Sequence, residues 1–412
     1  MGDDLKAAGA LPPLHGAWLR ALTGLPDPPP EPAATCGDCV MCGGVERSGS
    51  RVTFSPDVKC CSYVPHLANF VAGRALAGPG RASVVDRIAR RAGVTPLGLG
   101  LSRADLRRVV GVQAHFGQEA RVRCPHFDER TQGCGIWESR NAVCSTWFCR
   151  HERGATGQGV WHAVRDLLIA AEEQVAHHCL GRAGLPDAQV AAVLDHRAAL
   201  REAVRRANDG DVAGADGEDD ASSAWYARMW GDWQGREEEW FAGCAEVAGA
   251  LDAGQLAALL DDDGRGVEAV ARRRALLAAR TVPDRLVFAP GPASEATDDV
   301  LRLAGYSPFD LLVLPADLEP DLWLLDGRPR AEVPARLDDD VLGRLLDFGV
   351  AAVAEAAAAP EPANPEPANP EPANLDAAAL DRGIDLDGVV AGALPPAAGR
   401  HLDLDDDELA VR

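Results

Sequence analysis

The sequence is poor in lysine and in long apolar runs. Lys6 and Lys59 are its two lysines, and no apolar stretch approaches the roughly 20 residues that a membrane helix requires. The beginning of the chain, MGDDLKAAGALPPLHGAWLR, has two acids near its start and lacks the apolar core of a secretory signal. We therefore expect a cytoplasmic protein with reduced thiols and no membrane partner.

Positive charge is also scarce. The chain of 412 residues carries 41 lysine and arginine residues against 63 aspartate and glutamate residues, which gives a formal net charge of -22. Nucleic acids and anionic membranes are bound mainly through basic surfaces, so this balance argues against both as partners. The length is sufficient for two or three domains.

The short motifs of common catalytic sites are absent as well. We find no P-loop, no G-x-G-x-x-G nucleotide loop, no H-E-x-x-H zinc motif and no serine-hydrolase signature. The C-x3-C-x2-C spacing of radical enzymes is also absent, because the spacing here is C-x2-C-x2-C. The sequence thus predicts no specific reaction and leaves open whether the protein is an enzyme.

Cysteine, in contrast, is abundant in one segment. Nine of the eleven cysteines lie between residues 36 and 149, and the first three have a spacing that lets a short, turning backbone direct three thiolates to one point. Two groups of soft ligands that flank one domain indicate a metal ion or cluster held between distant parts of the chain. The predicted metal ligands are Cys36, Cys39, Cys42, Cys60, Cys61, Cys124, Cys134, Cys144 and Cys149.

Two other roles for these cysteines compete with metal binding. Disulfides form in oxidising compartments and mostly stabilise small secreted domains, which disagrees with the absence of a secretory signal. Core thiols are common, because cysteine packs as a small apolar residue, but scattered core thiols do not explain the regular early spacing or the adjacent Cys60-Cys61 pair. We therefore favour a metal or iron–sulfur site.

The later cysteines belong to a longer pattern. It runs from Cys124-Pro125 through Cys134-Gly135-Ile136-Trp137-Glu138 and Arg140 to Cys144 and Cys149. This pattern resembles the YkgJ-like family of CxxCxxCC cysteine-cluster proteins, which is described as zinc- or iron-chelating. The early motif departs from that family, because Gly43 follows Cys42 and the adjacent cysteine pair lies downstream. Asn141 also stands where the family often has proline.

The resemblance covers about residues 34–155 and implies a zinc or iron–sulfur site. It also implies that Arg140 supports the cofactor by donating N–H groups to a ligand or to sulfur. Nine thiolates are one more than two four-thiolate sites need, so one cluster plus one zinc ion, or one cluster plus spare thiols, would fit. We hypothesise that all nine lie close enough to ligate at most two centres. His126 and His151 follow cysteines closely, and for both we favour a structural role over ligation.

A mainly α fold in five parts is expected. The parts are a disordered tail over 1–33, a cysteine-rich metal-binding helical domain over 34–155, a helical middle region over 156–282 packed on it, a small α+β winged-helix-like module over 283–355, and a linker with an acidic tail over 356–412. The linker contains Pro-Glu-Pro-Ala-Asn three times, which predicts an extended polyproline-type segment. Leu402, Leu404 and Leu409 stand among acids in the tail, for which we favour solvated disorder over docking.

Apolar spacing predicts the helices of the middle region. Val160, Val164, Leu167, Leu168, Ala171 and Val175 recur at helical spacing, and Cys179 continues their stripe, so we interpret it as a core residue. Cys244 shares a helix face with Trp240 and is interpreted in the same way. The aromatic run from Trp225 to Phe241 fits either helix packing, which we favour, or a ligand pocket. Leu194 is expected to face inwards.

Earlier elements can also be placed. A helix is predicted over Val64 to Leu76, and Ser83 and Ser102 are candidate caps of the next two helices. The segment 81–123 holds nine arginines against three acids. Such a basic face fits a solvated helix surface, which we favour, or an anion site or charge compensation for the thiolates.

The module over 283–355 has three candidate strands, Arg285–Phe288, Val300–Ala304 and Asp310–Leu314, followed by a helix-turn-helix pattern from Asp321. Its Leu-Leu-Asp-Gly-Arg-Pro element, followed by helices, is similar to small PqqD-like winged-helix modules that hold peptides. A peptide or protein partner is therefore expected here. The acids at Asp338, Asp339, Asp340 and Asp347 argue against contact with nucleic-acid phosphates.

Three functions follow from these patterns. The first is a metal-binding protein, iron–sulfur or zinc, that serves an undefined process. The second is a metal-dependent enzyme that modifies peptides or proteins presented by the C-terminal module. The third is an adaptor whose metal only stabilises the fold.

Overall fold

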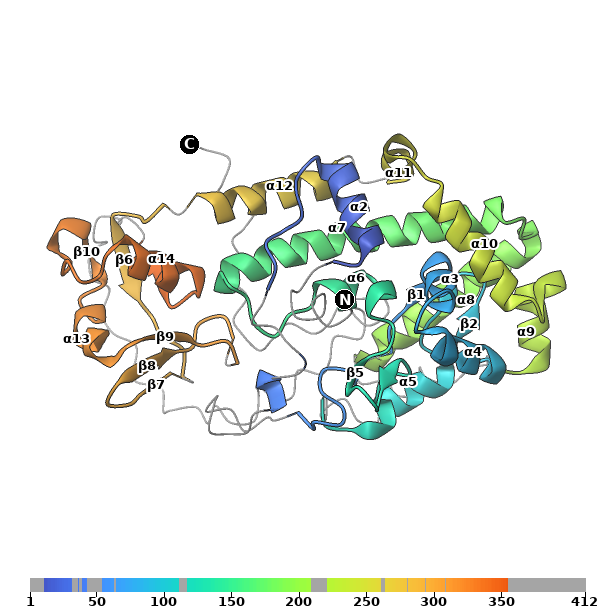
Figure 1. The fold of residues 1–412 in the computed structure, drawn as a ribbon, viewed down its shortest axis with the longest axis horizontal. Helices are drawn as coiled ribbons and strands as arrows, with labels where there is room; N and C mark the ends of the chain where they lie inside the picture. The colour runs from blue at the N-terminus through green and yellow to red at the C-terminus, as the bar shows by residue number, and fades with distance from the viewer. Residues whose placement is uncertain are drawn as a thin grey trace, which may run out of the picture.

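The computed structural model is an elongated body of helices with a small α+β module at one end (Figure 1). The predicted linker and tail over 356–412 lie outside the residues that the structure describes. Within those residues, no helix is both long and apolar enough to cross a bilayer. The described residues are 11–31, 36, 39–42, 54–62, 64–110, 117–208, 221–260, 264–279, 281–292, 294–307 and 309–354.

The first described element is a helix, α2 (Pro13–Thr23), where the sequence predicts a tail over 1–33. The prolines that suggested a tail stand just before the helix, in its first turn and after it. Proline is tolerated in a first helical turn because its missing N–H has no partner there anyway. Trp18 and Leu19 are buried, and Gly24 ends the helix in the left-handed conformation. Burial of two large side chains therefore fixes a segment that composition alone describes as a tail.

The next helices, α3 and α4, lie in sequence between strands of one three-stranded antiparallel sheet. Strand β1 precedes them, β2 and β3 follow them, and the order in the sheet is β1-β3-β2. The helix predicted from Val64 begins later, at Asn69, because Leu67 and Ala68 pair with β3. Asn69 donates its side-chain N–H groups to the carbonyls of Pro96 and Ala176, which fixes this start. The elements are β1 (Leu67–Ala68), α3 (Asn69–Leu76), α4 (Arg81–Arg90), β2 (Val94–Thr95), β3 (Gly98–Leu99) and α5 (Arg103–Val110).

The two candidate helix caps differ. Ser102 accepts the backbone N–H of Asp105 and precedes α5, as expected. Ser83 instead lies inside α4, which begins after Gly80, and its hydroxyl bonds the Gly80 carbonyl and the His126 ring. Five of the nine arginines of the basic face pair with acids, in Arg81–Glu238, Arg90–Asp86, Arg108–Asp105, Arg121–Glu119 and Arg123–Glu129. Such pairing fits a charge-balanced surface.

Short elements carry the later cysteines. Strands β4 (Phe127–Asp128) and β5 (Gly133–Cys134) form a hairpin, and the five-residue helix α6 (Ala142–Thr146) follows it. The Asn141 side chain accepts the backbone N–H of Cys144 at 3.0 Å and so caps α6. Three 3₁₀ turns, Val40–Cys42, Ala120–Val122 and Trp137–Ser139, complete this region.

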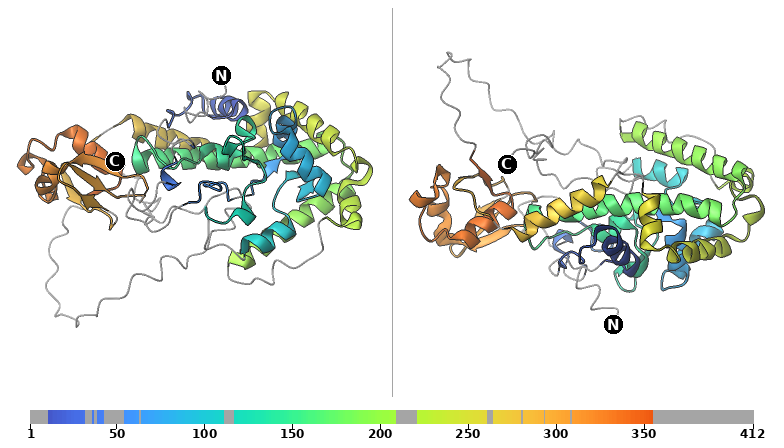
Figure 2. Two further views of the ribbon diagram at one scale, coloured as in Figure 1. Left: turned by 60° about the horizontal axis from the view of Figure 1, so that its bottom comes forward. Right: turned by 90° about the horizontal axis from the view of Figure 1, so that it is seen from above.

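Long helices form the middle of the body (Figure 2). The predicted stripe of α7 is buried along its length, and it belongs to one core that also contains α3 and α10. The parts predicted as 34–155 and 156–282 therefore share this core, and a second, smaller cluster also contains residues of both parts. The helices are α7 (Gly154–Arg182), α8 (Asp187–Asn208), α9 (Ser223–Trp230), α10 (Glu237–Gly249), α11 (Ala253–Leu259) and α12 (Arg265–Ala278).

The aromatic run packs as core. Trp230 and Trp240 are fully buried, and the Trp240 indole donates to the Pro96 carbonyl at 3.0 Å. Cys179 and Cys244 are also fully buried, which confirms them as core thiols. Leu194 is 39% exposed, so its inward placement was wrong.

The C-terminal module has its own core between two three-stranded antiparallel sheets, ordered β10-β6-β11 and β7-β8-β9. The three predicted strands are present as β6, β8 and β9. The helix-turn-helix pattern is interrupted, because the residues after the four-residue helix α13 form strand β10 along β6. The elements are β6 (Arg285–Phe288), β7 (Glu295–Ala296), β8 (Val300–Leu303), β9 (Leu312–Pro315), α13 (Glu319–Leu322), β10 (Asp326–Pro329), α14 (Asp339–Asp347) and β11 (Ala351–Val353).

A part-buried ion pair joins this module to the body. Arg153, just before α7, donates to both carboxylate oxygens of Asp347 on α14, at 2.5 and 2.9 Å. It also donates to the Leu277 carbonyl at 2.8 Å. Gly154, with a φ of +48°, brings the start of α7 so close to Phe348 that a Cβ would meet its ring at 2.8 Å. The module therefore docks onto the turn that follows the last cysteine of the cluster.

Replacing Arg153 with alanine should loosen this docking by about 1–3 kcal/mol, because Asp347 stays buried and loses the two hydrogen bonds from the guanidinium. Hydrogen exchange at the amides of α14 should then become faster. Arg344 on the same helix offers a matched control, since it donates to Val313 within the module and its replacement should leave the docking unchanged. Unaltered exchange in Arg153→Ala would contradict the assignment.

Candidate metal centre

The early and late cysteine segments lie side by side. The backbone N–H of Cys124 donates to the Cys61 carbonyl at 2.5 Å, which joins the two segments directly. Lys59 adds two bonds, because its ammonium group donates to the Cys36 carbonyl at 2.8 Å and to the Gln132 carbonyl at 2.7 Å. These backbone contacts bring the two distant cysteine segments together, as expected from the sequence.

One group of cysteines packs around two apolar side chains. Met41 and Phe54 are buried, and four of the predicted ligands contact this small cluster together with Phe309 of the C-terminal module. The four are Cys39, Cys42, Cys60 and Cys149. An apolar surround of this kind limits the access of water to the thiols.

A second group surrounds Arg140. Its guanidinium interacts electrostatically with the thiols of Cys134, Cys144, Cys36 and Cys60. The β4–β5 hairpin places Cys134, and the cap of α6 places Cys144. Cys124 in turn interacts with Cys134 and Cys144.

Cys60 links the two groups. Its side chain bonds that of Cys61, and its thiol interacts electrostatically with cysteines from both segments. The partners are Cys36, Cys39, Cys42, Cys61, Cys134, Cys144 and Cys149. These interactions connect the nine predicted ligands, and Cys60 has the most partners among them.

Arg140 is a buried cation with an open donor. The residue is only 6% exposed, and its guanidinium carbon lies over the Trp137 ring, 3.7 Å from the ring centroid. Nη1 donates to the Cys144 carbonyl at 2.8 Å and Nε to the Trp137 carbonyl at 3.2 Å, whereas Nη2 has no partner among the described residues. Burial lowers the pKa of Arg140, and the neighbouring cysteines oppose this as thiolates. The guanidinium therefore needs a negative neighbour that thiolates can supply.

Burial makes several of these thiols harder to deprotonate than an exposed thiol. It raises the pKa of Cys149 to about 12, and it also raises the pKa of Cys124 and of Cys144. The pKa of Cys60 is raised first by its bond to Cys61 and then by burial. Lys59 and Arg140 act in the opposite direction on their neighbours. A metal ion must consequently displace protons when it binds these thiols.

Proton displacement gives a pH prediction. Zinc added to the metal-free protein near pH 7 should release about one proton per thiol that it binds, up to about four for a tetrahedral site. Apparent zinc affinity should therefore fall as the pH falls, since protons compete for the thiolates. A pH indicator in weak buffer measures the release, and protein alkylated at its thiols is the control. Binding without proton release would contradict thiolate ligation.

The same pKa shifts determine how the metal-free protein responds to alkali. A thiol whose pKa is raised in the folded state contributes stability below its unfolded pKa of about 8.5, and loses it as the pH rises through the folded value. For Cys149 that window runs from about 8.5 to about 12. Thiolate absorbance should therefore appear at higher pH in folded than in urea-unfolded protein.

In the described part of the chain the cysteines lie near one another, but their side chains are not arranged as the ligands of a metal ion. Among the described residues, no three cysteine, histidine or acidic side chains stand in an arrangement that could hold a metal ion as placed. All eleven cysteines are free, and two neighbouring pairs of the set, Cys39 with Cys42 and Cys60 with Cys61, hydrogen-bond through their side chains. Neutral thiols pack and bond in this way, so ligation requires deprotonation together with local adjustment of the sulfur atoms.

The two candidate histidines differ in their surroundings. His151 bonds the hydroxyl of Tyr306 at 3.1 Å, and its backbone N–H donates to Asp310 at 2.9 Å, so the C-terminal module holds it in place. His126 bonds Ser83 through Nδ1 at 2.8 Å, while its buried Nε2 has no partner among the described residues. The structural role that we favour suits His151 in particular.

Sequence reasoning missed Lys59 and Phe309. Lys59 carries positive charge beside the thiols, and a signal was present, because it is one of two lysines and directly precedes Cys60. Phe309 comes from the distant module, and no local pattern marks it.

The resemblance to cysteine-cluster proteins rests on the cysteine motif between Cys124 and Cys149 alone, because comparisons with known proteins add nothing to it. No protein-family model matches this sequence, and no curated protein or solved structure is significantly similar to it.

Proposed function

We propose that this chain is a metal-binding protein whose zinc or iron–sulfur site lies in the cysteine cluster. The observation that carries the proposal is Arg140, a buried guanidinium with an open N–H among four thiols. A buried cation without a countercharge is costly, and a thiolate–metal centre would provide that countercharge.

The charges near the cluster suit a four-thiolate centre. Four thiolates around a centre of charge +2 leave a net charge of -2. Arg140 interacts with thiols of both segments, and Lys59 interacts with Cys36 and Cys42 of the early one. Arg87 and Arg150 act on Cys124 and Cys149, so several cations offset that charge. The nine cysteines supply more ligands than one such centre needs, so a second centre or spare thiols complete the set. Zinc would stabilise the fold there, and an iron–sulfur cluster would also allow electron transfer.

The first experiment is anaerobic purification followed by metal analysis and an absorption spectrum of one sample. Brown protein that contains iron and acid-labile sulfide would identify an iron–sulfur protein. Colourless protein with stoichiometric zinc would identify a structural site. Folded protein that binds neither zinc nor iron after reduction would overturn the proposal.

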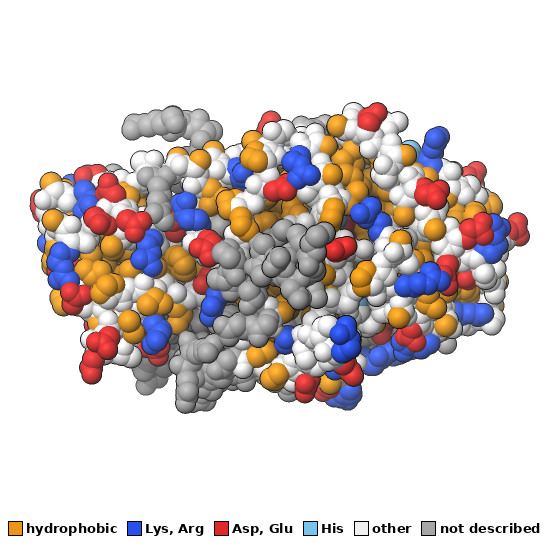
Figure 3. Space-filling model, in the orientation of Figure 1, with side chains coloured by type: hydrophobic (Ala, Val, Ile, Leu, Met, Phe, Trp, Pro, Cys, Tyr) orange, Lys and Arg blue, Asp and Glu red, His pale blue; other side chains and the backbone are white. Residues whose placement is uncertain are grey.

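A second candidate function, modification of a peptide or protein at the metal, draws on the C-terminal module. Four of the large apolar side chains that are exposed in the described structure belong to this module, and Figure 3 shows hydrophobic groups on its surface at the left. They are Val287, Val313, Trp323 and Val353. Phe309 of the same module packs beside the cysteines, so the module itself contacts the cysteine cluster.

The coordination of the metal separates this candidate from a purely structural adaptor. Four thiolates around each centre favour the adaptor, and three protein ligands with one open position favour the enzyme. X-ray absorption at the metal edge, which counts sulfur neighbours, distinguishes the two. A peptide or protein partner remains an expectation for either case.

A further inference from the structure

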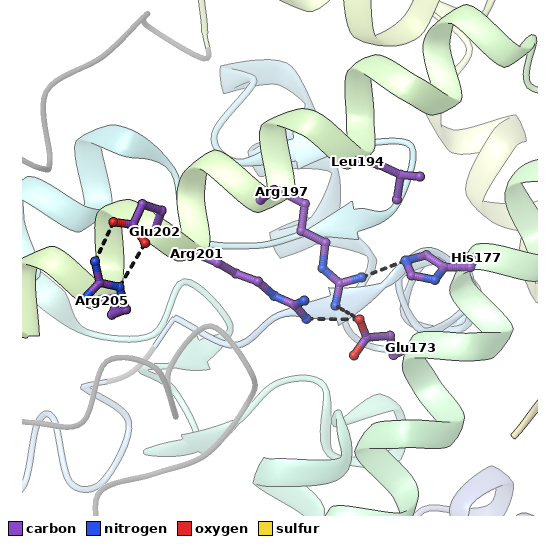
Figure 4. Close-up of a pocket in the computed structure, with 8 residues that line it drawn as sticks. Glu173, His177, Leu194, Arg197, Arg201, Glu202 and Arg205 are labelled. Atoms are coloured by element: carbon purple, nitrogen blue, oxygen red, sulfur yellow. Dashed lines mark hydrogen bonds and ion pairs between the residues drawn. The ribbon is translucent and has the colours of Figure 1, made fainter. Parts of the chain in front are cut away.

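A groove between α7 and α8 holds a group of charged side chains that the metal proposal does not use. Its volume is about 400 Å³, within the range of roughly 300–1,000 Å³ found for small-ligand sites. Arg197 and Arg201 reach across from α8 towards Glu173 and His177 on α7 (Figure 4). No cysteine lines this groove.

The two arginines share a single carboxylate oxygen. Glu173 Oε1 accepts from Arg197 Nη2 at 2.9 Å and from Arg201 Nη2 at 3.0 Å. One negative charge therefore faces two positive charges. The remaining charged pair of the lining, Arg205 with Glu202, is neutral as a unit. The groove keeps a residual charge of about +1 in a chain whose net charge is -22.

His177 does not change this balance. Arg197 Nη1 donates to His177 Nε2 at 2.9 Å, so the imidazole accepts a hydrogen bond and is neutral in this arrangement. Burial lowers the pKa of His177, and the Arg197 charge lowers it further. The imidazole thus orients Arg197 without adding charge.

An apolar surface adjoins the two guanidinium groups. Leu194 and Ala198 line the groove, and Leu194 is one of the few large apolar side chains of the described structure that are exposed. Arg201 is also accessible, with 43% of its side chain exposed. A ligand could therefore reach a cation and an apolar surface together.

We propose that this groove binds a small organic carboxylate, with its carboxylate on Arg197 and Arg201 and its apolar body on Leu194. A guanidinium presents parallel N–H donors that match the planar carboxylate. The residual charge of about one also suits a monoanion better than a dianionic phosphate. The competing interpretation is a salt bridge that only clamps α7 to α8.

Calorimetric titration of the full chain with hexanoate tests the proposal. Saturable binding of one hexanoate per chain is expected, with weaker binding of acetate, which lacks the apolar body, and none of hexan-1-ol, which lacks the charge. Inorganic phosphate provides the second arm. Phosphate binding as tight as that of hexanoate, or no saturable hexanoate binding, would overturn the proposal.

Two variants separate a ligand site from a clamp. Arg201→Gln removes the residual charge and should weaken hexanoate binding at least about tenfold. Glu173→Gln removes the competing carboxylate and should strengthen binding several-fold. Arg165→Gln on α7 makes the same charge change at a residue that pairs with Asp166 outside the lining, and it should bind as the parent chain does. If both groove variants lose stability without these opposite changes in affinity, the arginines act only as a clamp.

Discussion

Replacing Cys60 with serine will remove the metal of the centre that Cys60 ligates. Cys60 interacts with Cys39 and Cys61 of the early segment and with Cys134, Cys144 and Cys149 of the late one, so we expect its loss to remove a ligand from a centre that the segments share. A serine hydroxyl does not ionise near neutral pH and is a poor ligand for soft metals. Metal content per chain after anaerobic reconstitution measures the effect.

Cys179→Ser is the matched control. Cys179 is fully buried in the core, where its thiol faces the Cys244 carbonyl at 3.6 Å, and we expect this variant to bind as much metal as the parent chain. Circular dichroism confirms that both variants are folded. Full metal content in folded Cys60→Ser would contradict a centre built around Cys60.

The same assay counts centres when one cysteine from each group is replaced. Cys39 packs beside Phe54, and Cys144 lies beside Arg140. With one shared centre, Cys39→Ser and Cys144→Ser should each remove nearly all the metal. With two centres, each variant should keep the metal of the other group.

Gly73→Ala should destabilise the fold by about 3 kcal/mol, at the upper end of the usual cost of overpacking. Helix α3 crosses α10 so closely at this glycine that a Cβ would overlap the Phe241 carbonyl and lie 2.9 Å from the Ala245 methyl. Backbone cannot move aside as a side chain can, so the two helices must separate along their contact. Urea unfolding of the metal-free protein measures the loss.

Gly243→Ala provides the contrast within α10. A Cβ at Gly243 meets nothing within 4 Å, so alanine should raise stability by up to about 1 kcal/mol through its better helix propensity. The two substitutions are chemically identical and opposite in expected sign. Equal effects at both positions would show that close packing of α3 against α10 does not limit stability.

Apolar spacing in the sequence correctly predicted which faces of α7 and α10 are buried. The stripe of α7 from Val160 to Val175 is buried as expected, because an amphipathic face must pack. Cys179 and Cys244 were identified as core for the same reason. The cysteine spacing indicated a common site, and the backbone brings the two segments together, although ligation itself stays a prediction.

The features that the sequence did not predict depend on contacts between residues far apart in the chain. Helix α2 forms because Trp18 and Leu19 find a core formed elsewhere in the chain. Strand β10 replaces the expected helix because β6 offers a pairing edge. Phe309 and Asp347 meet the cysteine region from the C-terminal module, and no periodicity within either segment encodes such a long-range contact.

The bond between Cys61 and Cys124 joins segments that are far apart in sequence. A metal ligated from both sides of this junction acts as a reversible cross-link that closes a long loop in the unfolded chain. By analogy with disulfides, closure of such a loop is worth roughly 4 kcal/mol of chain entropy. Because contacts between distant segments form late in folding, the cysteines would remain open to oxidation until that step. A reducing environment would then matter most while the chain folds.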